Sequence, residues 1–206
     1  MNDERPDTRE ALLADATDEF ARRGLKGARV RAIVQAAGVN ERMLYHHFGS
    51  KEGLYQAVLA SVWTSPDLRS ALHAHAALPP YEGFRALLVE LFAWFQARPA
   101  VLPLVIHEWL TGWEHLPPAS LDRLPPELSA LFARGQQEGV FRSDVAFETF
   151  YLTALGALVS IGTVGNRFED LRERMRTDPA AAFALRDRVL DLVFHGACVP
   201  TERRTG

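Results

Sequence analysis

The sequence VRAIVQAAGVNERMLYHHFGSKEGL, residues 30–54, decides the fold. Its first residues form one apolar helix face, because they recur at i, i+3, i+4 and i+7: Val30, Ile33, Val34 and Ala37. Gly38 follows, and glycine accepts the left-handed conformation found just past a helix end. Asn40 then suits an N-cap, since its side chain can accept from free backbone N–H groups. The stretch therefore predicts two short helices joined by a tight turn, a helix-turn-helix.

The second helix has an inward and an outward face. Leu44 and Phe48 point inward, Gly49 ends the helix, and Ser50 can cap a third helix. The outward side presents four polar or charged residues that reach base edges and phosphates: Glu41, Arg42, Tyr45 and His46. This face predicts contact with double-stranded DNA. The alternatives are a helix-turn-helix that contacts only proteins and a chance pattern.

A family resemblance rests on this same region. The run AAGVNERMLYHHFGSKEGLY, residues 36–55, is highly specific, and the segment from Phe20 to Val58 resembles the DNA-binding region of the TetR family of transcriptional regulators. One departure matters. Ala28 and Arg29 stand where the family usually has Thr or Ser, so the usual hydroxyl contact to a DNA phosphate is lost. We expect Arg29 to supply a charged contact instead.

The resemblance implies roles for the residues of the head. Candidates for base reading are Glu41, Arg42 and Met43 at the start of the second motif helix, together with His46 further along it, which could contact either a base or a phosphate. Arg42 is the strongest, because arginine can bind guanine with two hydrogen bonds. For Glu41, a solvated carboxylate at a helix start is an equally good interpretation. Candidates for phosphate contacts are Arg29, Tyr45, His47 and Lys51.

The charge of the chain is divided unevenly. The 206 residues carry a net charge of −3, with composition typical of a soluble globular protein. Residues 20–51 contain seven basic side chains and one acidic, a net +6, so the remainder carries −9. A basic segment on an acidic body is typical of a protein that touches DNA at one end.

Other classes of site find little support. Cys198 is the single cysteine and MNDERPDTRE is not a signal peptide, so we expect a cytoplasmic protein without an intrachain disulfide. His73 with His75, and His107 with Glu108, have spacings that do not bring ligands together on a helix. We therefore expect no metal and no cofactor. The uncharged stretch 149–166 predicts a buried helix rather than a membrane span.

The fold class is all-α. Thr8 can cap a first helix that ends at Gly24, and no segment shows strand alternation bounded by turns. We expect a three-helix DNA-binding head at residues 1–52 and a helical effector-binding and dimerisation body at residues 53–206. The resemblance implies about nine helices in total.

The last two long helices predict a homodimer. Asp144 can cap the first, and Asp178 with Pro179 gives the second an N-cap and N1 pair. The first is apolar nearly all round, so it must be covered on every side. We expect both to pair with their symmetry mates as a four-helix bundle. The expected interface residues are Phe150, Leu155, Gly156, Ser160, Leu190, Val193 and Phe194.

An effector site is expected in the body, where the family binds one. Aromatic residues at helical spacing are more often plain core. The segment from Phe92 to Trp113 nevertheless places polar residues among aromatic ones, and Arg98 and Glu108 could orient a polar group. The expected pocket residues are Phe92, Phe95, His107, Glu108, Trp109, Trp113 and Tyr151, with a small hydrophobic or aromatic effector.

The sequence thus predicts a homodimeric, ligand-responsive repressor that binds a near-palindromic operator. Two alternatives remain at this point. One is a helical DNA-binding protein without a small-molecule effector, whose body is solid core. The other is a helical-bundle enzyme, although no catalytic motif of the GxSxG or HExxH kind occurs in the chain.

Overall fold

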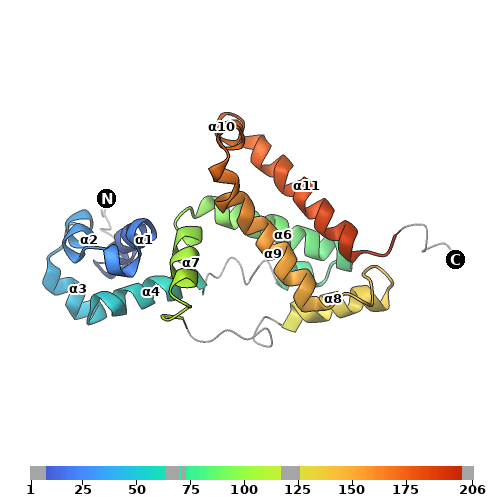
Figure 1. Cartoon of the computed structure of the whole chain (residues 1–206). Coiled ribbons are helices and arrows are strands. Elements are labelled where there is room, and N and C mark those ends of the chain that lie inside the picture. The colour runs from blue at the N-terminus through green and yellow to red at the C-terminus, as the bar shows by residue number, and fades with distance from the viewer. Residues whose placement is uncertain (1–7, 64–69, 71–72, 117–125, 201–206) are drawn as a thin grey trace, which may run out of the picture. The chain divides into compact units, whose positions relative to one another are not determined.

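A computed structural model describes residues 8–63, 70, 73–116 and 126–200. Within these residues the ordered elements are ten α-helices and one 3₁₀ helix, with a single isolated bridge between Phe141 and Cys198 (Figure 1). The all-α prediction is confirmed, and the helix count is slightly above the expected nine.

The chain divides into two compact units. The head unit comprises Met1–Ser65 with Arg98–Ala119, and the body unit comprises Pro66–Ala97 with Ser120–Gly206. The head unit contains α1 (Thr8–Gly27), α2 (Val30–Ala36), α3 (Glu41–Phe48), α4 (Lys51–Trp63) and α7 (Val101–Leu110). The functional boundary predicted at residue 52 stays a prediction; by packing, α4 and α7 belong with the head.

The head unit is built around the apolar stripes of its helices. Helix α1 contacts α2, α3, α4 and α7 (Figure 1). Leu12, Phe20, Ile33 and Leu44 are fully buried in the shared core. Such short helices are unstable alone, so this mutual burial is what holds them. The motif helices are thereby fixed on a small rigid core.

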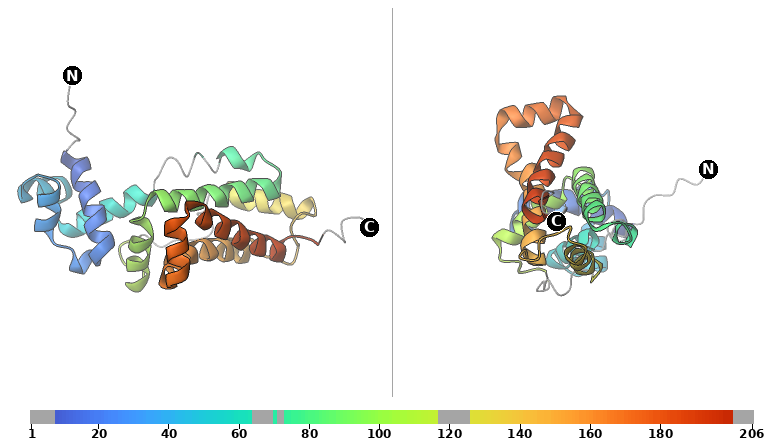
Figure 2. Two further views of the ribbon diagram at one scale, coloured as in Figure 1. Left: turned by 90° about the horizontal axis from the view of Figure 1, so that it is seen from above. Right: turned by 90° about the vertical axis from the view of Figure 1, so that its right-hand side faces the viewer.

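The body unit holds the remaining helices. They are α6 (Pro80–Ala97), α8 (Pro126–Gln137), α9 (Phe147–Thr163), the 3₁₀ helix η2 (Gly165–Arg167), α10 (Glu169–Thr177) and α11 (Pro179–Ala197). Figures 1 and 2 show α6, α9 and α11 packed against one another. Phenylalanines dominate the core: the Phe132 ring stacks on Phe141 at 5.0 Å and on Phe150 at 5.2 Å. Such aromatic pairs add to the free energy of area burial.

The predicted helix starts in the body have different outcomes. Asp178 caps α11 as expected, accepting from the backbone N–H of Ala180 at 2.9 Å. The prediction for Asp144 is wrong. Its carboxylate instead binds the Arg142 guanidinium at 2.6 and 2.9 Å, and α9 begins after Ala146, which has no side-chain cap.

Three of the expected interface residues require correction. Phe150, Leu190 and Phe194 are buried in the core of the body unit, so their side chains have almost no surface to offer a partner. Leu155 and Val193 are partly buried, while Gly156 and Ser160 are exposed. A dimer through α9 and α11 stays a prediction, and Gly156 and Ser160 are the expected interface residues whose surface is open to a partner.

None of the helices in the described segments could span a membrane by itself. No single helix among them has the required length and hydropathy, and α6 and α7 reach it only when joined across the break between them. The uncharged stretch 149–166 forms most of α9, whose inward residues Phe150, Ala154 and Leu158 are buried.

Candidate nucleic-acid interface

Helix α3 is held in place by local and core contacts. The Asn40 side chain accepts from the backbone N–H of Met43 at 3.1 Å, which satisfies one of the free donors of the first turn. Leu44 is fully buried, and Gly49 ends the helix with φ +74°. Glycine reaches this positive φ without steric strain. The cap, the inward anchor and the stop predicted from the sequence are thus confirmed.

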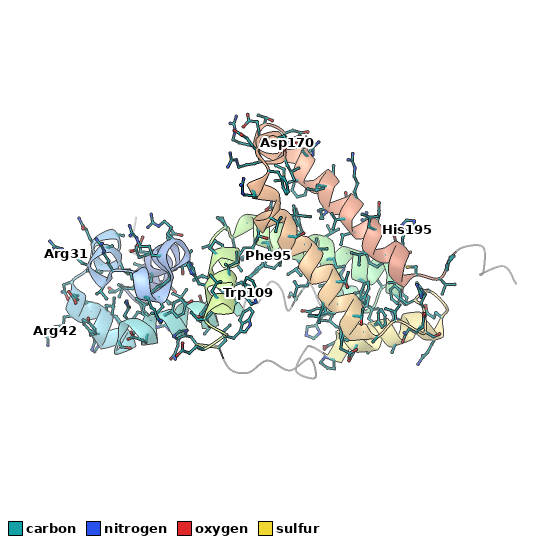
Figure 3. All side chains as sticks on the ribbon, in the orientation of Figure 1. Arg31, Arg42, Phe95, Trp109, Asp170 and His195 are labelled. Carbon is teal, nitrogen blue, oxygen red and sulfur yellow. The ribbon has the colours of Figure 1, made fainter. Side chains whose placement is uncertain are left out.

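The outward face of α3 is open to solvent. Glu41, Arg42, Tyr45 and His46 are exposed, and Met43 is half-buried. A hydrogen bond from the Tyr45 hydroxyl to Glu41 raises the pKa of Tyr45. Glu41 lies exposed in the first turn of α3, where the helix dipole favours a carboxylate, so both interpretations of this residue stay open. Figure 3 shows Arg42 extending outward from the head unit, at the end where Arg31 also lies.

The expected phosphate contacts differ in how free their side chains are. Arg29 is exposed at the N-cap of α2, and its side chain makes no capping bond. Lys51 donates to the backbone carbonyl of Ala28 at 3.2 Å, which leaves two of its three donors for other partners. The Nε2 atom of His47 is buried without a hydrogen-bond partner among the described residues. A phosphate contact by His47 would need its other ring nitrogen or a rotated ring.

Glu19 is a residue of this region that the sequence patterns did not identify. Its side chain is buried, and its Oε1 atom accepts from the backbone N–H of Arg29 at 3.2 Å. The guanidinium groups of Arg23 and Arg22 lie 3.2 and 3.5 Å from its carboxylate oxygens. Glu19 thus ties α1 to the start of α2. A signal existed, because an acidic residue stands three positions after Ala16 on the apolar side of the first helix.

The third motif helix is fixed by the predicted cap. The Ser50 hydroxyl accepts from the backbone N–H of Gly53 at 2.9 Å. Lys51, in the first turn of α4, also reaches the junction of α1 and α2 through Ala28. This contact joins α4 to the segment that carries Arg29. The four helices therefore present α3 and the start of α2 as one rigid surface.

Helix α7 joins the head unit through a histidine. Nε2 of His107 donates to the carbonyl of Ala21 in α1 at 3.2 Å, since a carbonyl can only accept. The ring packs against Gly24, where a Cβ atom would lie 2.9 Å from Nδ1. Gly24 also interrupts α1 with φ +62° and ψ 176°, so the first straight helix ends where the sequence predicted. The close approach of α7 therefore requires glycine at this position.

Glu108 lies beside this contact in a buried polar network. Its carboxylate accepts from the Tyr55 hydroxyl at 2.9 Å, from Nδ1 of His115 at 3.1 Å and from the His115 backbone N–H at 3.2 Å. Burial, and next the bond to Glu108, raise the pKa of Tyr55 far above its usual value. A cavity of about 330 Å³ adjoins these residues and Lys26 within the head unit. The network links α4 to α7 and the segment after it.

The expected effector residues fall in different units. His107 and Glu108 line the cavity of the head unit, whereas Trp109 is 65 % exposed and Trp113 is 42 % exposed. The other three belong to the body unit: Phe92 is buried in its core, and Phe95 and Tyr151 are partly buried. Burial raises the pKa of Tyr151. Within neither unit do the expected residues form one aromatic pocket, and the effector site stays a prediction.

Metal chemistry gains no candidate from the geometry. Over the described ranges, no three His, Cys, Asp or Glu side chains cluster closely enough to hold an ion. His73 pairs with Glu127 at 3.5 Å and His75 with Glu90 at 2.9 Å. The two histidines thus bind separate carboxylates.

Comparisons with known proteins agree with this geometry. A family model described as "Bacterial regulatory proteins, tetR family" matches residues 12–58, and "Tetracyclin repressor-like, C-terminal domain" matches residues 80–193. The HTH-type transcriptional repressor NicS of Pseudomonas putida is 29 % identical over 70 % of this chain and 71 % of its own. The HTH-type transcriptional repressor AcnR of Corynebacterium glutamicum is 26 % identical over 83 % of this chain and 90 % of its own. The ketosteroid transcriptional regulator KstR2 of Mycobacterium tuberculosis has the same fold, with a TM-score of 0.67 and 21 % identity over 96 % of this chain and 98 % of its own.

Proposed function

Since the chain belongs to the TetR family of bacterial regulatory proteins, we propose that it is a homodimeric repressor that leaves a near-palindromic operator when a small effector binds. The family and the regulators it resembles also confirm the expectation that the chain is not an enzyme. The observation that carries the proposal is the exposed polar face of α3 on a rigid helix-turn-helix. A surface of guanidinium, phenol and imidazole groups has no structural use in a head whose core is complete without it.

DNA reading is divided between base and backbone contacts. The first turns of α3 enter the major groove, where Arg42, Met43 and His46 reach base edges. Glu41 is the weakest base-reading residue, because a solvated carboxylate in the first turn of α3 is favoured by the helix dipole without any base contact. The backbone phosphates are held by Arg29, Tyr45, Lys51 and His47, which set the register without reading sequence. Neutralising phosphates releases counterions, so affinity falls steeply with salt.

Dimerisation uses the outer faces of α9 and α11. On α9, Leu152, Gly156 and Ser160 are exposed and four residues apart, and nothing lies within 4 Å of a Cβ built on Gly156. On α11, Leu192 is 76 % exposed and Gly196 is equally open. Small residues beside exposed leucines let a second copy approach closely. Two heads related by a two-fold axis then bind half-sites about one helical turn apart.

Effector response passes through α7. This helix packs on α1 through His107 and Gly24, while only Arg98, Pro99 and Ala100 separate it from the end of α6 in the body unit. An effector that binds the body changes the position of the end of α6, and the short connection carries the change to α7. The factor by which the effector lowers operator affinity is set by how much more tightly the effector binds the DNA-free state than the operator-bound state.

The test is selection of bound sequences from random duplex DNA at fixed salt. We expect the wild type to enrich a near-palindrome. Arg42→Ala should lose preference at one base pair in each half-site, a change of about 1–3 kcal/mol for a bidentate contact. Arg174→Ala, an exposed arginine of α10, is the matched control and should select the wild-type motif. Absence of any enriched sequence with the wild type would contradict the proposal.

A further inference from the structure

Helix α10 is the least anchored helix of the body unit. None of its nine residues is buried, and only Leu171 and Met175 are partly buried. Figure 2 (right) shows α10 and the first part of α11 projecting beyond the other helices of this unit. A helix with so little buried apolar surface gains little stability from packing. It is therefore an element whose position a ligand can determine.

A cavity of about 260 Å³ lies between α10 and parts of α6, α9 and α11. Its lining has an apolar wall and a polar rim. The wall is formed by Ile161, Met175 and Ala182, and the rim by Gln96, Arg172 and Arg176. The volume is near the lower end for small-molecule pockets, so the ligand is small.

The two arginines of the rim have different partners. They are four residues apart and therefore lie on the same face of α10. Arg176 binds both carboxylate oxygens of Glu173, at 2.6 and 2.8 Å, and this hydrogen bond lowers the pKa of Glu173. Arg172 makes no ion pair with any described residue. The charge of Arg172 also helps to lower the pKa of Glu173, but only Arg176 contacts that carboxylate, so the Arg172 guanidinium keeps its hydrogen-bond donors for a ligand.

We propose that this cavity binds a small carboxylate with an apolar body. The carboxylate binds the Arg172 guanidinium, whose planar donors match two carboxylate oxygens. The apolar part of the ligand lies against Ile161, Met175 and Ala182. Arg172 is the one rim guanidinium without an ion pair among the described residues, and one such group suits a single negative charge better than the two of a phosphate monoester. The ligand covers apolar surface that α10 itself leaves partly exposed.

The cavity is joined to the head by a short run of chain. Gln96 of the rim is one residue from the end of α6 at Ala97, and α7 begins at Val101. A ligand that contacts Gln96 thus acts at the start of the connection to α7. The proposal that this cavity binds a carboxylate does not depend on the proposed function. The further proposal that this carboxylate is the effector rests on the proposed function.

The test uses the full-length chain and three probes of one chain length: hexanoate, hexan-1-ol and hexylamine. Saturation-transfer NMR and calorimetry measure their binding. We expect hexanoate to bind, and the alcohol and the amine to bind at least about tenfold more weakly, because a charge-assisted contact contributes that much. Arg172→Ala should weaken hexanoate binding by a similar factor. Arg174→Ala, equally exposed on α10 but outside the cavity lining, should bind as the wild type does.

Two results would overturn the site. One is the absence of hexanoate binding, or equal binding of the three probes; the other is an equal effect of Arg172→Ala and Arg174→Ala. Both arginines are exposed, so unfolding curves should show that both variants fold normally. Operator binding with and without hexanoate separates the two proposals. Specific hexanoate binding with unchanged operator affinity leaves the site standing and refutes its role in regulation. A chain that selects no DNA sequence but binds hexanoate refutes the proposed function alone.

Discussion

At the residue scale, Glu19 is the side chain that organises the DNA-binding head. Glu19 is only 4 % exposed, and Ala16 and Phe20 near it in the sequence are fully buried. A buried carboxylate is tolerated only with compensating charges and hydrogen bonds. Arg22 and Arg23 supply the charges, and the Arg29 backbone N–H supplies the hydrogen bond. Arg29 has no hydroxyl group with which to cap α2. The Glu19 carboxylate of α1 instead accepts a hydrogen bond from the Arg29 backbone N–H and so links α1 to the start of α2.

We expect Glu19→Ala to reduce the free energy of unfolding by about 1–3 kcal/mol, because it removes the partner of a partly buried backbone N–H. Glu19→Gln should cost less, since its amide oxygen can still accept from Arg29. Urea unfolding at neutral pH measures both. Asp18→Ala is the control, because this neighbouring acidic side chain is exposed. Equal losses for the Glu19→Ala and Asp18→Ala variants would show that the carboxylate has no special role.

Sequence patterns predicted individual residues well where the interaction is local. Asn40, Ser50 and Asp178 cap helices as expected, because a cap and its N–H partner are two or three residues apart. Glu19 and Arg29 are ten residues apart, and their bond depends on how α1 and α2 meet. His107 and Ala21 are 86 residues apart. Helical periodicity carries no information about such pairs.

At the element scale, the junction of α1 and α7 depends on one glycine. Gly24 has φ +62° and ψ 176°, a conformation that is essentially confined to glycine. The His107 ring also occupies the space that a Cβ atom would need. Two separate restrictions therefore coincide at this position, one in the backbone and one from the neighbouring helix.

We expect Gly24→Ala to destabilise the chain more than Gly38→Ala does. Gly38 has a similar φ of +66°, but nothing lies within 4 Å of its built Cβ atom. Each substitution should cost about 1–3 kcal/mol of backbone strain. The Gly24 variant should lose more because its φ and ψ are essentially confined to glycine and because its Cβ atom must also displace His107. Thermal and urea unfolding measure the difference, and equal losses would show that His107 moves aside freely.

The predicted elements were correct in kind, but their faces could not all be assigned. Helix α9 is apolar on most of its surface, so its pattern does not say which side meets the core of its own chain. Phe150 was expected at a dimer interface and is in the core; Leu152, two residues away, is 57 % exposed. The start of α9 was also misplaced, because Arg142 binds the carboxylate of Asp144. Side-chain partners of this kind are decided by tertiary structure.

At the scale of the whole molecule, the positive charge is concentrated in one segment of the head unit rather than in the unit as a whole. Segment 20–51 carries +6, the other residues of the head unit carry −7, and the body unit carries −2. A short α3 reads only a few base pairs, so one head alone has limited affinity and specificity. Binding of two paired heads to two half-sites therefore supplies the affinity and the specificity that a regulator needs. The dimer is the property on which the proposed function most depends.

We expect Leu192→Glu to convert the proposed dimer into a monomer at micromolar concentration, measured by light scattering. Leu192 is 76 % exposed on α11, so a carboxylate there is well solvated in a monomer and must be desolvated in an interface. Leu110→Glu, at 68 % exposure in the head unit, is the matched control and should stay dimeric. The Leu192 variant should also lose affinity for the full operator while its affinity for a single half-site is unchanged. A Leu192→Glu chain that remains dimeric would exclude this face of α11 from the interface.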